Sequence, residues 1–435
     1  MNDRPRVVIV GAGFGGLRAA AALKNAPVDV VLIDRFNYHT FQPLLYQVAT
    51  SALEPGEIAS TVRGIFHHQK NFAFELGNVV GVDWEQKALL LEDEPPVPFN
   101  YLILAAGAST NYFGIDGAEQ YSFPMKTVDE ANALRNHIIT VFEEVSADPE
   151  LIDEGWLNFV VVGGGPTGVE MAGALSELFD MVLRKDYPRL DMNRAHVVLL
   201  EASDKVLAPF APNLRSYTLD ELRKRHVDVR LGEAVTKVTE DTVYLKSGGE
   251  IRTRTVVWGA GIRGVPMANG LGVEVGRGGR VVVNDDLSLP GHPEAFVIGD
   301  LAASKGPDGN IYPQLARVAI DGGKHAARMI LRHMQGLPGE PFIYKDPGTM
   351  ATIGRNAAVA QLPGDIKLKG FLAWSAWVWL HLWFLVGFRN RVGVFVSWVW
   401  NYFTYDRGVR MIMPTPRRRR HQFQAAAKES EEIAA

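Results

Sequence analysis

The order of apolar and polar positions predicts an α/β protein in which one supersecondary unit occurs twice. RVVIVGAGFGGLRAAAAL (6–23) predicts a strand, a glycine turn and an alanine-rich helix, and VDVVLIDR (28–35) predicts the next strand. WLNFVVVGGGPTGVEMAGALSEL (156–178) and AHVVLLEAS (195–203) repeat this order, with the second glycine turn 152 residues after the first. Two such units are most simply explained by two nucleotide sites.

Glycine turns also follow other predicted strands. NYLILAAGAS (100–109), TVVWGAGIRG (255–264) and AFVIGDLAAS (295–304) each combine an apolar run with a turn, and a helix is predicted over 314–334. From about residue 346 the composition changes. The 435 residues suffice for two or three domains with a large core.

The first glycine turn has the spacing of a dinucleotide-binding motif. Gly11, Gly13 and Gly16 lie between a predicted strand and a predicted helix, and Asp34 ends the next strand. The first glycine permits the tight bend, the second lets the backbone approach a pyrophosphate, and the third lets the helix pack on the strand. The helix N-terminus offers free N–H groups to phosphates, and the acid can accept the ribose hydroxyls.

The second turn repeats this chemistry and favours one cofactor. Its glycines have the same spacing, at Gly163, Gly165 and Gly168. Glu201 takes the place of the aspartate, and Asp204 follows without an arginine beside it. Two carboxylates would repel a 2′-phosphate, so we expect NADH rather than NADPH, although Lys205 could still reach the phosphate.

A third turn, Gly299-Asp300, adds to the nucleotide interpretation. It follows an apolar strand and precedes a predicted helix. An aspartate at this place could bond the ribityl or phosphate part of an extended FAD, and the helix N-terminus would stabilise an anionic reduced flavin.

The composition excludes several kinds of redox chemistry. Because the chain has no cysteine, it can hold no disulfide, thiolate zinc site, iron–sulfur cluster, cysteine nucleophile or redox-active dithiol. Any redox reaction must therefore use a bound organic cofactor. We predict no metal site.

Tryptophan and arginine are concentrated near the C-terminus. Six of the nine tryptophans lie in residues 374–400, residues 371–388 carry no charge, and residues 389–420 contain eight arginines and one aspartate. Residues 1–388 carry a net charge of −9, which argues against nucleic acid as the partner of the arginine run Arg417–Arg420. An anionic membrane surface is the favoured partner.

The apolar segment 371–388 predicts membrane association in the plane of the bilayer. Its tryptophans occur along the whole segment and His381 lies near its middle, whereas spanning helices place tryptophan at their two ends. A single spanning helix over 371–388 and a buried core or dimer interface remain alternatives. No secretory signal is visible at the N-terminus.

Together these motifs resemble the two-dinucleotide-binding-domain flavoproteins, in which an NAD(P)H domain is inserted into an FAD domain. Within that superfamily, the missing cysteines leave ferredoxin-reductase-like enzymes and the type II, non-proton-pumping NADH:quinone oxidoreductases. The segments FQPLLYQVAT (41–50), GGGPTGVE (163–170) and the aromatic end over 369–412 resemble the second family.

This resemblance implies two Rossmann-like domains in a glutathione-reductase-like arrangement. A discontinuous FAD-binding domain is expected over 1–118 and 272–345, with an NADH-binding domain inserted over 119–271. Residues 346–435 are expected to form a C-terminal membrane-anchoring helical region with a basic tail.

The resemblance also implies an activity and partners. The protein would oxidise NADH through FAD and reduce a membrane quinone by two electrons without pumping protons, as a homodimer on the cytoplasmic face of the cell membrane. Two rival functions remain open: a soluble NAD(P)H-dependent flavin reductase of an iron–sulfur protein or oxygen, and a redox sensor that binds FAD and NADH.

The site residues follow from the motifs and the resemblance. Expected FAD contacts are Gly11, Gly13, Phe14, Gly15, Gly16, Asp34, Arg35, Ala106, Gly107, Gly299 and Asp300, with His39 a weaker candidate. Expected NADH contacts are Gly163, Gly165, Pro166, Thr167, Gly168, Glu170, Glu201 and Gly261. Quinone-site candidates are Gln42, Tyr46, Gln47 and Arg317.

Two of these assignments have alternatives. Glu170 is either a carboxylate stabilised by its helix N-terminus or a catalytic, proton-handling group near the nicotinamide–flavin junction. The family commonly has A-Q-x-A-x-Q after the third turn, where this chain has ARVAID (316–321). Arg317 either pairs with Asp321 on one helix face or replaces a glutamine as donor to a quinone or flavin oxygen.

Overall fold

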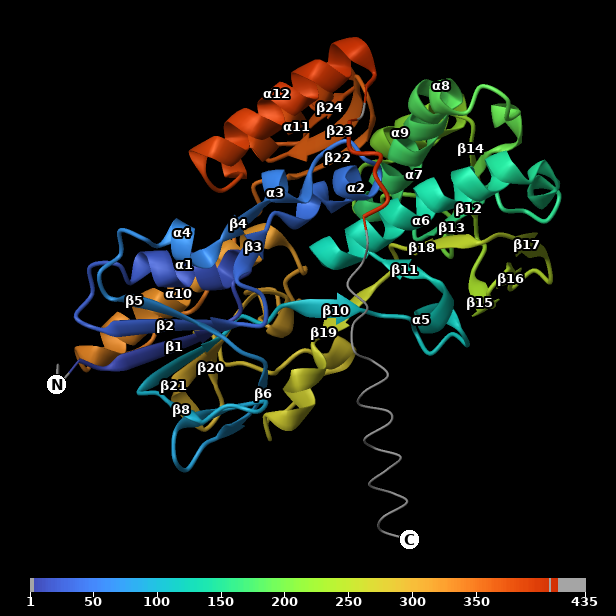
Figure 1. Ribbon diagram of the computed structural model, residues 1–435. Helices are drawn as coiled ribbons and strands as arrows, with labels where there is room; N and C mark the ends of the chain where they lie inside the picture. Colours follow the sequence, from blue (N-terminus) through green and yellow to red (C-terminus); the bar gives the residue numbers. More distant parts are fainter. Residues whose placement is uncertain (1–3, 407, 414–435) are drawn as a thin grey trace, which may run out of the picture.

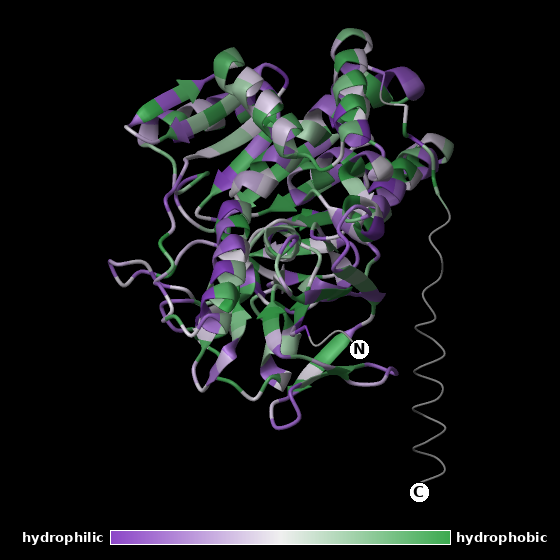
Figure 2. Ribbon diagram, turned by 90° about the vertical axis from the view of Figure 1, so that its left-hand side faces the viewer, coloured by the Kyte–Doolittle hydropathy of each residue, from purple (hydrophilic) through white to green (hydrophobic). Residues whose placement is uncertain are grey.

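The computed structural model describes residues 4–406 and 408–413, and two parallel sheets form its centre (Figure 1). The arginine run 417–420 and the tail lie outside the described residues. The strands of both sheets are mostly apolar, as expected for parallel strands covered on both faces (Figure 2).

The first sheet has six strands and draws on two separate parts of the chain. Its order is β20 (Ser288–Leu289), β21 (His292–Val297), β9 (Tyr101–Leu104), β1 (Arg6–Val10), β2 (Asp29–Asp34) and β5 (Phe72–Leu76). All pairs are parallel except β20 with β21. Helices α1 (Phe14–Ala22) and α10 (Ala316–Met334) pack against one face, and β6 (Val79–Asp83), β7 (Ala88–Leu91) and β8 (Val97–Pro98) against the other.

The second sheet is built from the segment between those two parts. Its parallel order is β11 (Phe123–Pro124), β18 (Thr255–Trp258), β12 (Asn158–Val162), β13 (His196–Glu201) and β14 (Val227–Leu231). One face carries α6 (Val128–Ala147), α7 (Pro166–Leu178) and α9 (Pro212–Lys224), and the other carries β15 (Val235–Val238), β16 (Thr242–Leu245) and β17 (Glu250–Arg252). These two sheets confirm the predicted α/β fold.

Two antiparallel strands connect the halves of the molecule. The chain leaves the first sheet through β10 (Ala108–Thr110) and returns through β19 (Ile262–Gly264). Short elements lie around these segments: β3 (Tyr38–Thr40), β4 (Ala59–Thr61), α4 (Val62–Ile65), α5 (Ala118–Tyr121) and α8 (Arg184–Asp186).

The C-terminal region packs on the second half. Strands β22 (Thr349–Gly354), β23 (Ala357–Leu362) and β24 (Ile366–Lys369) form an antiparallel sheet beside α7, and α11 (Phe371–Phe384) and α12 (Phe388–Thr404) follow as a helical hairpin. In Figure 1 this hairpin lies near α2 (Leu45–Ala49) and α3 (Pro55–Ile58).

The uncharged segment 371–388 does not form one helix. Helix α11 ends at Phe384 after 14 residues, which corresponds to about 21 Å of helix against the roughly 30 Å of hydrocarbon in a bilayer. In the part of the chain that the structure describes, no helix is long and apolar enough to span a membrane. The alternative of a spanning helix over 371–388 is therefore wrong.

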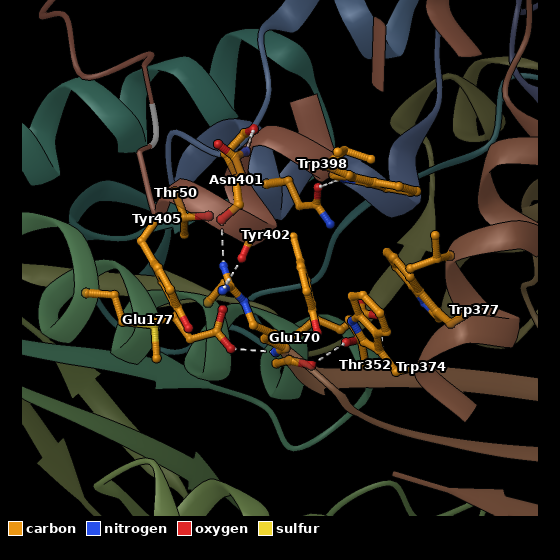
Figure 3. A pocket seen from close by; sticks show the side chains of 18 of the residues that line it. Thr50, Glu170, Glu177, Thr352, Trp374, Trp377, Trp398, Asn401, Tyr402 and Tyr405 are labelled. Carbon is orange, nitrogen blue, oxygen red and sulfur yellow. Dashed lines mark hydrogen bonds between the residues drawn. The ribbon is translucent and has the colours of Figure 1, made fainter. Parts of the chain in front are cut away.

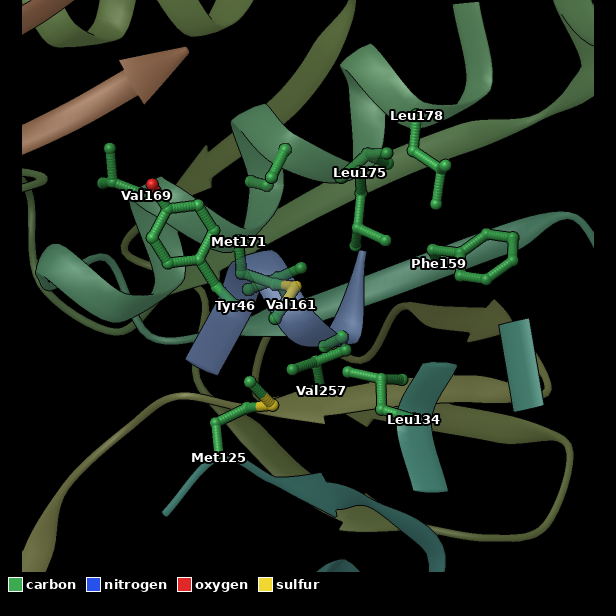
Figure 4. Packing of buried hydrophobic residues seen from close by; sticks show 14 of the residues in the cluster. Tyr46, Met125, Leu134, Phe159, Val161, Val169, Met171, Leu175, Leu178 and Val257 are labelled. Atoms are coloured by element: carbon green, nitrogen blue, oxygen red, sulfur yellow. The ribbon is translucent and has the colours of Figure 1, made fainter. Parts of the chain in front are cut away.

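One large core cluster joins α2 to the second half of the molecule. Tyr46 of α2 lies in the same buried cluster as Leu134 of α6, Val161 of β12 and Leu175 of α7 (Figure 4). The segment that was predicted to lie beside the flavin is thus held between the two nucleotide-binding units.

Candidate functional site

The two glycine turns have nearly identical backbone geometry. Gly11 and Gly163 have φ angles of 105° and 107°, a region that L side chains rarely adopt. A Cβ atom at Gly16 would lie 1.8 Å from the Gly11 carbonyl oxygen, and one at Gly168 would lie 1.8 Å from that of Gly163. Only glycine fits at both places, as the dinucleotide motif requires.

Both turns leave open space before a helix N-terminus. Gly13 directly precedes α1 and Gly165 directly precedes α7, and a Cβ at either position would meet no atom within 4 Å. Phe14 and Gly15 begin the first helix, and Pro166 and Thr167 begin the second. The exposed N–H groups at each turn fit the pyrophosphate of a dinucleotide, so the residues present suit FAD in the first turn and NADH in the second.

The two strand-end acids are held in the same way. Asp34 Oδ2 accepts the Ala12 amide at 2.6 Å and its Oδ1 accepts the Phe36 amide at 2.8 Å. Glu201 Oε2 accepts the Gly164 amide at 2.6 Å and its Oε1 accepts the Ser203 amide at 2.7 Å. Each carboxylate is fixed to its glycine turn and keeps further lone pairs for ribose hydroxyls.

Other predicted FAD residues surround the first turn. His39 is buried beneath it: its Nδ1 lies 2.8 Å from the Ala12 carbonyl oxygen, and its Nε2 has no partner within the described residues. Burial lowers the pKa of His39 to about 4, so this ring is neutral at pH 7. Arg35 is exposed, with its guanidinium 5.2 Å from the Phe36 ring centroid.

The remaining turns bring further groups to the carboxyl ends of the strands. Ala106 and Gly107 follow β9, Gly261 follows β18, and Gly299 and Asp300 follow β21. Burial raises the pKa of Asp300, while the charges of Lys126 and Arg280 lower it. Lys126 was not among the predicted site residues. It follows the short strand β11, which pairs with β18.

An apolar cavity of about 410 Å³ lies between the helical hairpin and the rest of the protein (Figure 3). Helices α2, α7, α11 and α12 and strand β22 all contribute to its wall. Of the four predicted quinone contacts, Tyr46 and Gln47 line it, whereas Gln42 and Arg317 do not. Lining residues that the motifs did not indicate include Trp374, Trp377, Trp398, Asn401 and Tyr402.

Gln47 links α2 to the hairpin. Its amide nitrogen donates to the Tyr46 hydroxyl at 2.9 Å, and its amide oxygen accepts the Trp398 indole N–H at 2.7 Å. The side chain therefore connects two elements more than 300 residues apart in sequence, which residue spacing alone could not indicate.

Glu170 lies in the cavity wall and is half-buried. Its carboxyl accepts the Thr352 amide at 3.3 Å. Burial raises the pKa of Glu170 to about 8, against smaller lowering effects of the Thr352 amide and the Trp377 indole. Glu170 is therefore mostly protonated at pH 7.

Arg317 and Asp321 form an ion pair on α10. Arg317 Nε lies 2.9 Å from Asp321 Oδ2, and the arginine side chain is 41% exposed. Of the two alternatives for Arg317, the structure shows pairing with Asp321 on one helix face. A pair this exposed contributes on the order of 0–1 kcal/mol to stability.

Helix α12 has three hydrogen-bonded polar residues on its inner face and many large apolar residues on its outer face. Asn390 donates to the Ala59 carbonyl at 3.1 Å, Ser397 to Glu57 at 2.5 Å and Asn401 to the Ala52 carbonyl at 2.9 Å. The exposed side chains of the hairpin are large and apolar, among them Leu372, Trp379, Trp383, Phe388, Val396, Trp400 and Phe403. A helix whose outer face meets water would instead have polar side chains on that face.

Arg355 fixes the end of the hairpin. Its guanidinium donates to the carbonyls of Asn401 at 2.7 Å and Tyr402 at 2.8 Å, at the C-terminal end of α12 where helix carbonyls lack their full set of intrahelical partners. The guanidinium carbon also lies 3.8 Å from the Tyr405 ring centroid.

Comparison with known proteins identifies the family. The family model of pyridine nucleotide-disulphide oxidoreductases matches residues 5–323. The type II NADH:quinone oxidoreductase Ndh of Mycobacterium tuberculosis is 41% identical over 421 residues, covering 93% of this chain and 89% of its own. The chain belongs to the type II NADH:quinone oxidoreductases. A Haemophilus influenzae member of this family is 29% identical over 86% of this chain and 92% of its own.

Solved structures show the same fold in this family and in neighbouring ones. NDH2 of Plasmodium falciparum, solved in complex with NADH, superposes with a TM-score of 0.85 at 19% identity, covering 94% of this chain and 100% of its own. The sulfide:quinone oxidoreductase of Aquifex aeolicus superposes with a TM-score of 0.69 at 18% identity, covering 92% and 95%. The predicted type II family is thus confirmed, in a chain that has no cysteine although the name of the wider family refers to a disulphide.

Proposed function

We propose that this protein oxidises NADH through FAD held at the first glycine turn and reduces a quinone bound in the cavity beneath the hairpin. Membership of the type II NADH:quinone oxidoreductases supports the overall reaction. The observation that carries the residue-level proposal is the pair of matching cradles, at Gly11–Gly16 and Gly163–Gly168, together with a cavity whose wall contains an acid with a raised pKa.

FAD supplies the chemistry of accepting a hydride and releasing two electrons. In our proposal the first turn holds its pyrophosphate, Asp34 its ribose and Asp300 its ribityl chain. The second turn and Glu201 hold NADH, so that the nicotinamide is directed toward the gap between the carboxyl ends of the two sheets. This alignment needs no protein base, because hydride transfer moves no separate proton.

Glu170 serves in this proposal as a proton donor for quinone reduction. Two-electron reduction of a quinone consumes two protons, and an acid with a pKa of about 8 keeps its proton at pH 7. The apolar wall excludes water, so a protonated side chain is needed where the quinone oxygen gains charge.

The outer face of the hairpin is proposed as the surface that contacts the membrane. Trp383 and Phe388 are 73% and 82% exposed, and such a large apolar patch is unusual on a surface that meets only water. The nearby Arg389 and Arg391 would lie at the level of anionic headgroups on the cytoplasmic face. A homodimer stays a prediction.

Anaerobic titration tests the proposed reaction. Purified protein is reconstituted with FAD, reduced with NADH while flavin absorbance is followed, and then mixed with ubiquinone or menaquinone analogues. We expect rapid bleaching by NADH and rapid reoxidation by at least one quinone. Bleaching without reoxidation by any quinone would instead favour a redox sensor, and reoxidation only by an iron–sulfur protein or oxygen would favour a flavin reductase.

A further inference from the structure

A half-buried lysine of the second unit has no partner. Lys126 follows β11, in which Pro124 pairs with Trp258 of β18, so Lys126 lies at the carboxyl end of the second sheet. Its ammonium group makes no hydrogen bond or ion pair with any residue that the structure describes. A cation that loses part of its hydration without gaining a counterion is costly, so its retention needs a reason.

An acid of the first unit lies within electrostatic range of this lysine. Asp300 follows β21, at the carboxyl end of the first sheet. The charge of Lys126 lowers the pKa of Asp300, yet the two side chains are not within the 4.0 Å of a salt bridge. The Asp300 carboxyl also accepts no hydrogen bond from the described part of the chain. Both groups are therefore available to a ligand that lies at the carboxyl ends of the two sheets.

The other cation that affects Asp300 is already engaged. Arg280 also lowers the pKa of Asp300 through its charge. Its Nε donates to the Ala302 carbonyl at 2.9 Å and its Nη1 donates to the Tyr312 carbonyl at 3.0 Å. Arg280 thus holds the backbone after β21, and Lys126 is the cation of the two that can still bind a ligand.

The backbone at Lys126 is fixed on both sides. Its amide donates to Glu130 Oε2 at 2.7 Å, and the Thr127 amide donates to the same oxygen at 2.9 Å. Thr127 and Glu130 form the capping box of α6. The preceding Met125 is 8% exposed and belongs to the core cluster that contains Tyr46 (Figure 4). The flexible lysine stem therefore starts from a rigid base and carries a point charge at its end.

Hydride transfer creates the negative charge that such a cation can offset. A hydride brings two electrons and one proton, so a neutral oxidised flavin becomes an anion until a second proton arrives. In the proposed function the first glycine turn holds the pyrophosphate of FAD and Asp300 its ribityl chain. The flavin ring then comes next along the cofactor, toward the second unit. A fixed cation at that place stabilises the reduced ring more than the oxidised ring.

We propose that the Lys126 ammonium binds the flavin ring of FAD from the NADH-binding unit and offsets the negative charge that the ring gains on reduction. The inference rests on the proposed function and adds to it a cofactor-binding residue that raises the reduction potential of the flavin. Because Lys126 belongs to the second unit and Asp300 to the first, this contact also requires that the two units be held together, as the shared core cluster holds them.

The test measures the reduction potential of the bound flavin rather than turnover. Lys126→Met removes the charge and keeps a long side chain. We expect the variant to bind reduced FAD about tenfold more weakly relative to oxidised FAD, which lowers the two-electron midpoint potential by about 30 mV. Equilibration with a reference dye under anaerobic conditions gives this potential. Lys246→Met, which removes an exposed lysine between β16 and β17, is the matched control and should leave the potential unchanged.

Two further variants separate the charge from the packing of the side chain. Lys126→Gln is a second neutral variant and should lower the potential as Lys126→Met does, whereas Lys126→Arg keeps the charge and should stay near the wild-type value. An unchanged potential in the two neutral variants would overturn the proposal, and so would an equal loss in Lys126→Arg. Failure of the wild-type protein to bind FAD, or of its flavin to be reduced by NADH, would instead overturn the proposed function.

Discussion

At the scale of single residues, burial decides what each carboxyl group can do. Burial raises the pKa values of both Asp34 and Glu170, but the Ala12 and Phe36 amides and the Arg35 charge oppose the effect at Asp34. At Glu170, only one backbone amide and one indole oppose the effect of desolvation. Asp34 is therefore placed to accept hydrogen bonds, whereas Glu170 is placed to hold and release a proton.

Replacing Glu170 by glutamine should remove the titratable carboxyl proton while the side chain keeps its size and its packing in the cavity wall. We expect quinone reduction to slow by roughly 100-fold, the usual contribution of a positioned acid, while NADH oxidation with ferricyanide is retained. In the wild type, kcat/KM for quinone should fall as pH rises through about 8, because Glu170 loses its proton there. The Glu170→Gln variant should not show this fall of kcat/KM at high pH. An unchanged fall in the variant would exclude Glu170 as its source.

The double change Glu201→Gln and Asp204→Lys should shift cofactor preference. Glu201 is fixed by two backbone amides beside the second turn, and Asp204 is exposed next to Lys205. Removing two negative charges and adding a positive one should lower the NADH/NADPH ratio of kcat/KM by roughly tenfold or more, since a 2′-phosphate is no longer repelled. The ratio is measured by steady-state kinetics, and no change would refute the role of Glu201.

At the scale of elements, the hairpin both closes the cavity and presents an apolar face. Its inner face buries Trp377, Leu385 and Val394 in the core. The same face binds the 52–60 segment through Asn390, Ser397 and Asn401. Its outer face exposes large apolar side chains. Deleting residues 371–435 would therefore remove membrane contact and open the cavity around Glu170 at once, so point changes are the better test.

Substituting Trp383 and Phe388, neither of which lines the cavity, by aspartate should weaken membrane binding while leaving the cavity closed. Both side chains are exposed, and neither makes the polar contacts that dock α12. Charges at these positions oppose insertion, so we expect at least a tenfold loss of partition onto anionic vesicles in a flotation assay. Glu94→Gln, an exposed change far from the hairpin, is the control. Undiminished flotation would show that another surface binds the lipid.

At the scale of the whole molecule, one buried helix, α2, links the two repeated strand–turn–helix units. Helix α2 comes from the first half of the chain, yet its Tyr46 is buried against α7 and β12 of the second (Figure 4). The two glycine turns and the cavity are consequently linked through packed elements rather than joined by a flexible linker.

FAD should stabilise the assembled molecule by binding only its folded form. At a free FAD concentration one hundred times its Kd, linkage predicts about 2.7 kcal/mol of added stability. The apoprotein should therefore unfold at a lower temperature than the FAD-loaded protein in calorimetry. An Asp34→Ala variant should show a smaller increase at the same FAD concentration, and an equal increase would argue against the first turn as the site.

The local motifs were predictable because their chemistry depends on neighbours in sequence. The glycines of each turn lie within six consecutive residues, and the acid ends the next strand of the same unit. Both turns have the predicted geometry. The absence of cysteine is likewise a property of the sequence alone. The α/β fold and the family followed from these motifs.

The tertiary structure decided what depends on residues far apart in the chain. Apolar spacing could not show that residues 371–388 contain the end of a helix, that Gln47 binds Trp398, or that Trp377 lies beside Glu170 in a cavity wall. Burial and hydrogen-bond saturation arise only when distant segments pack together, because each is set by neighbours in space. The sequence by itself therefore determined the nucleotide-binding units, and folding determined the cavity in which we place the quinone.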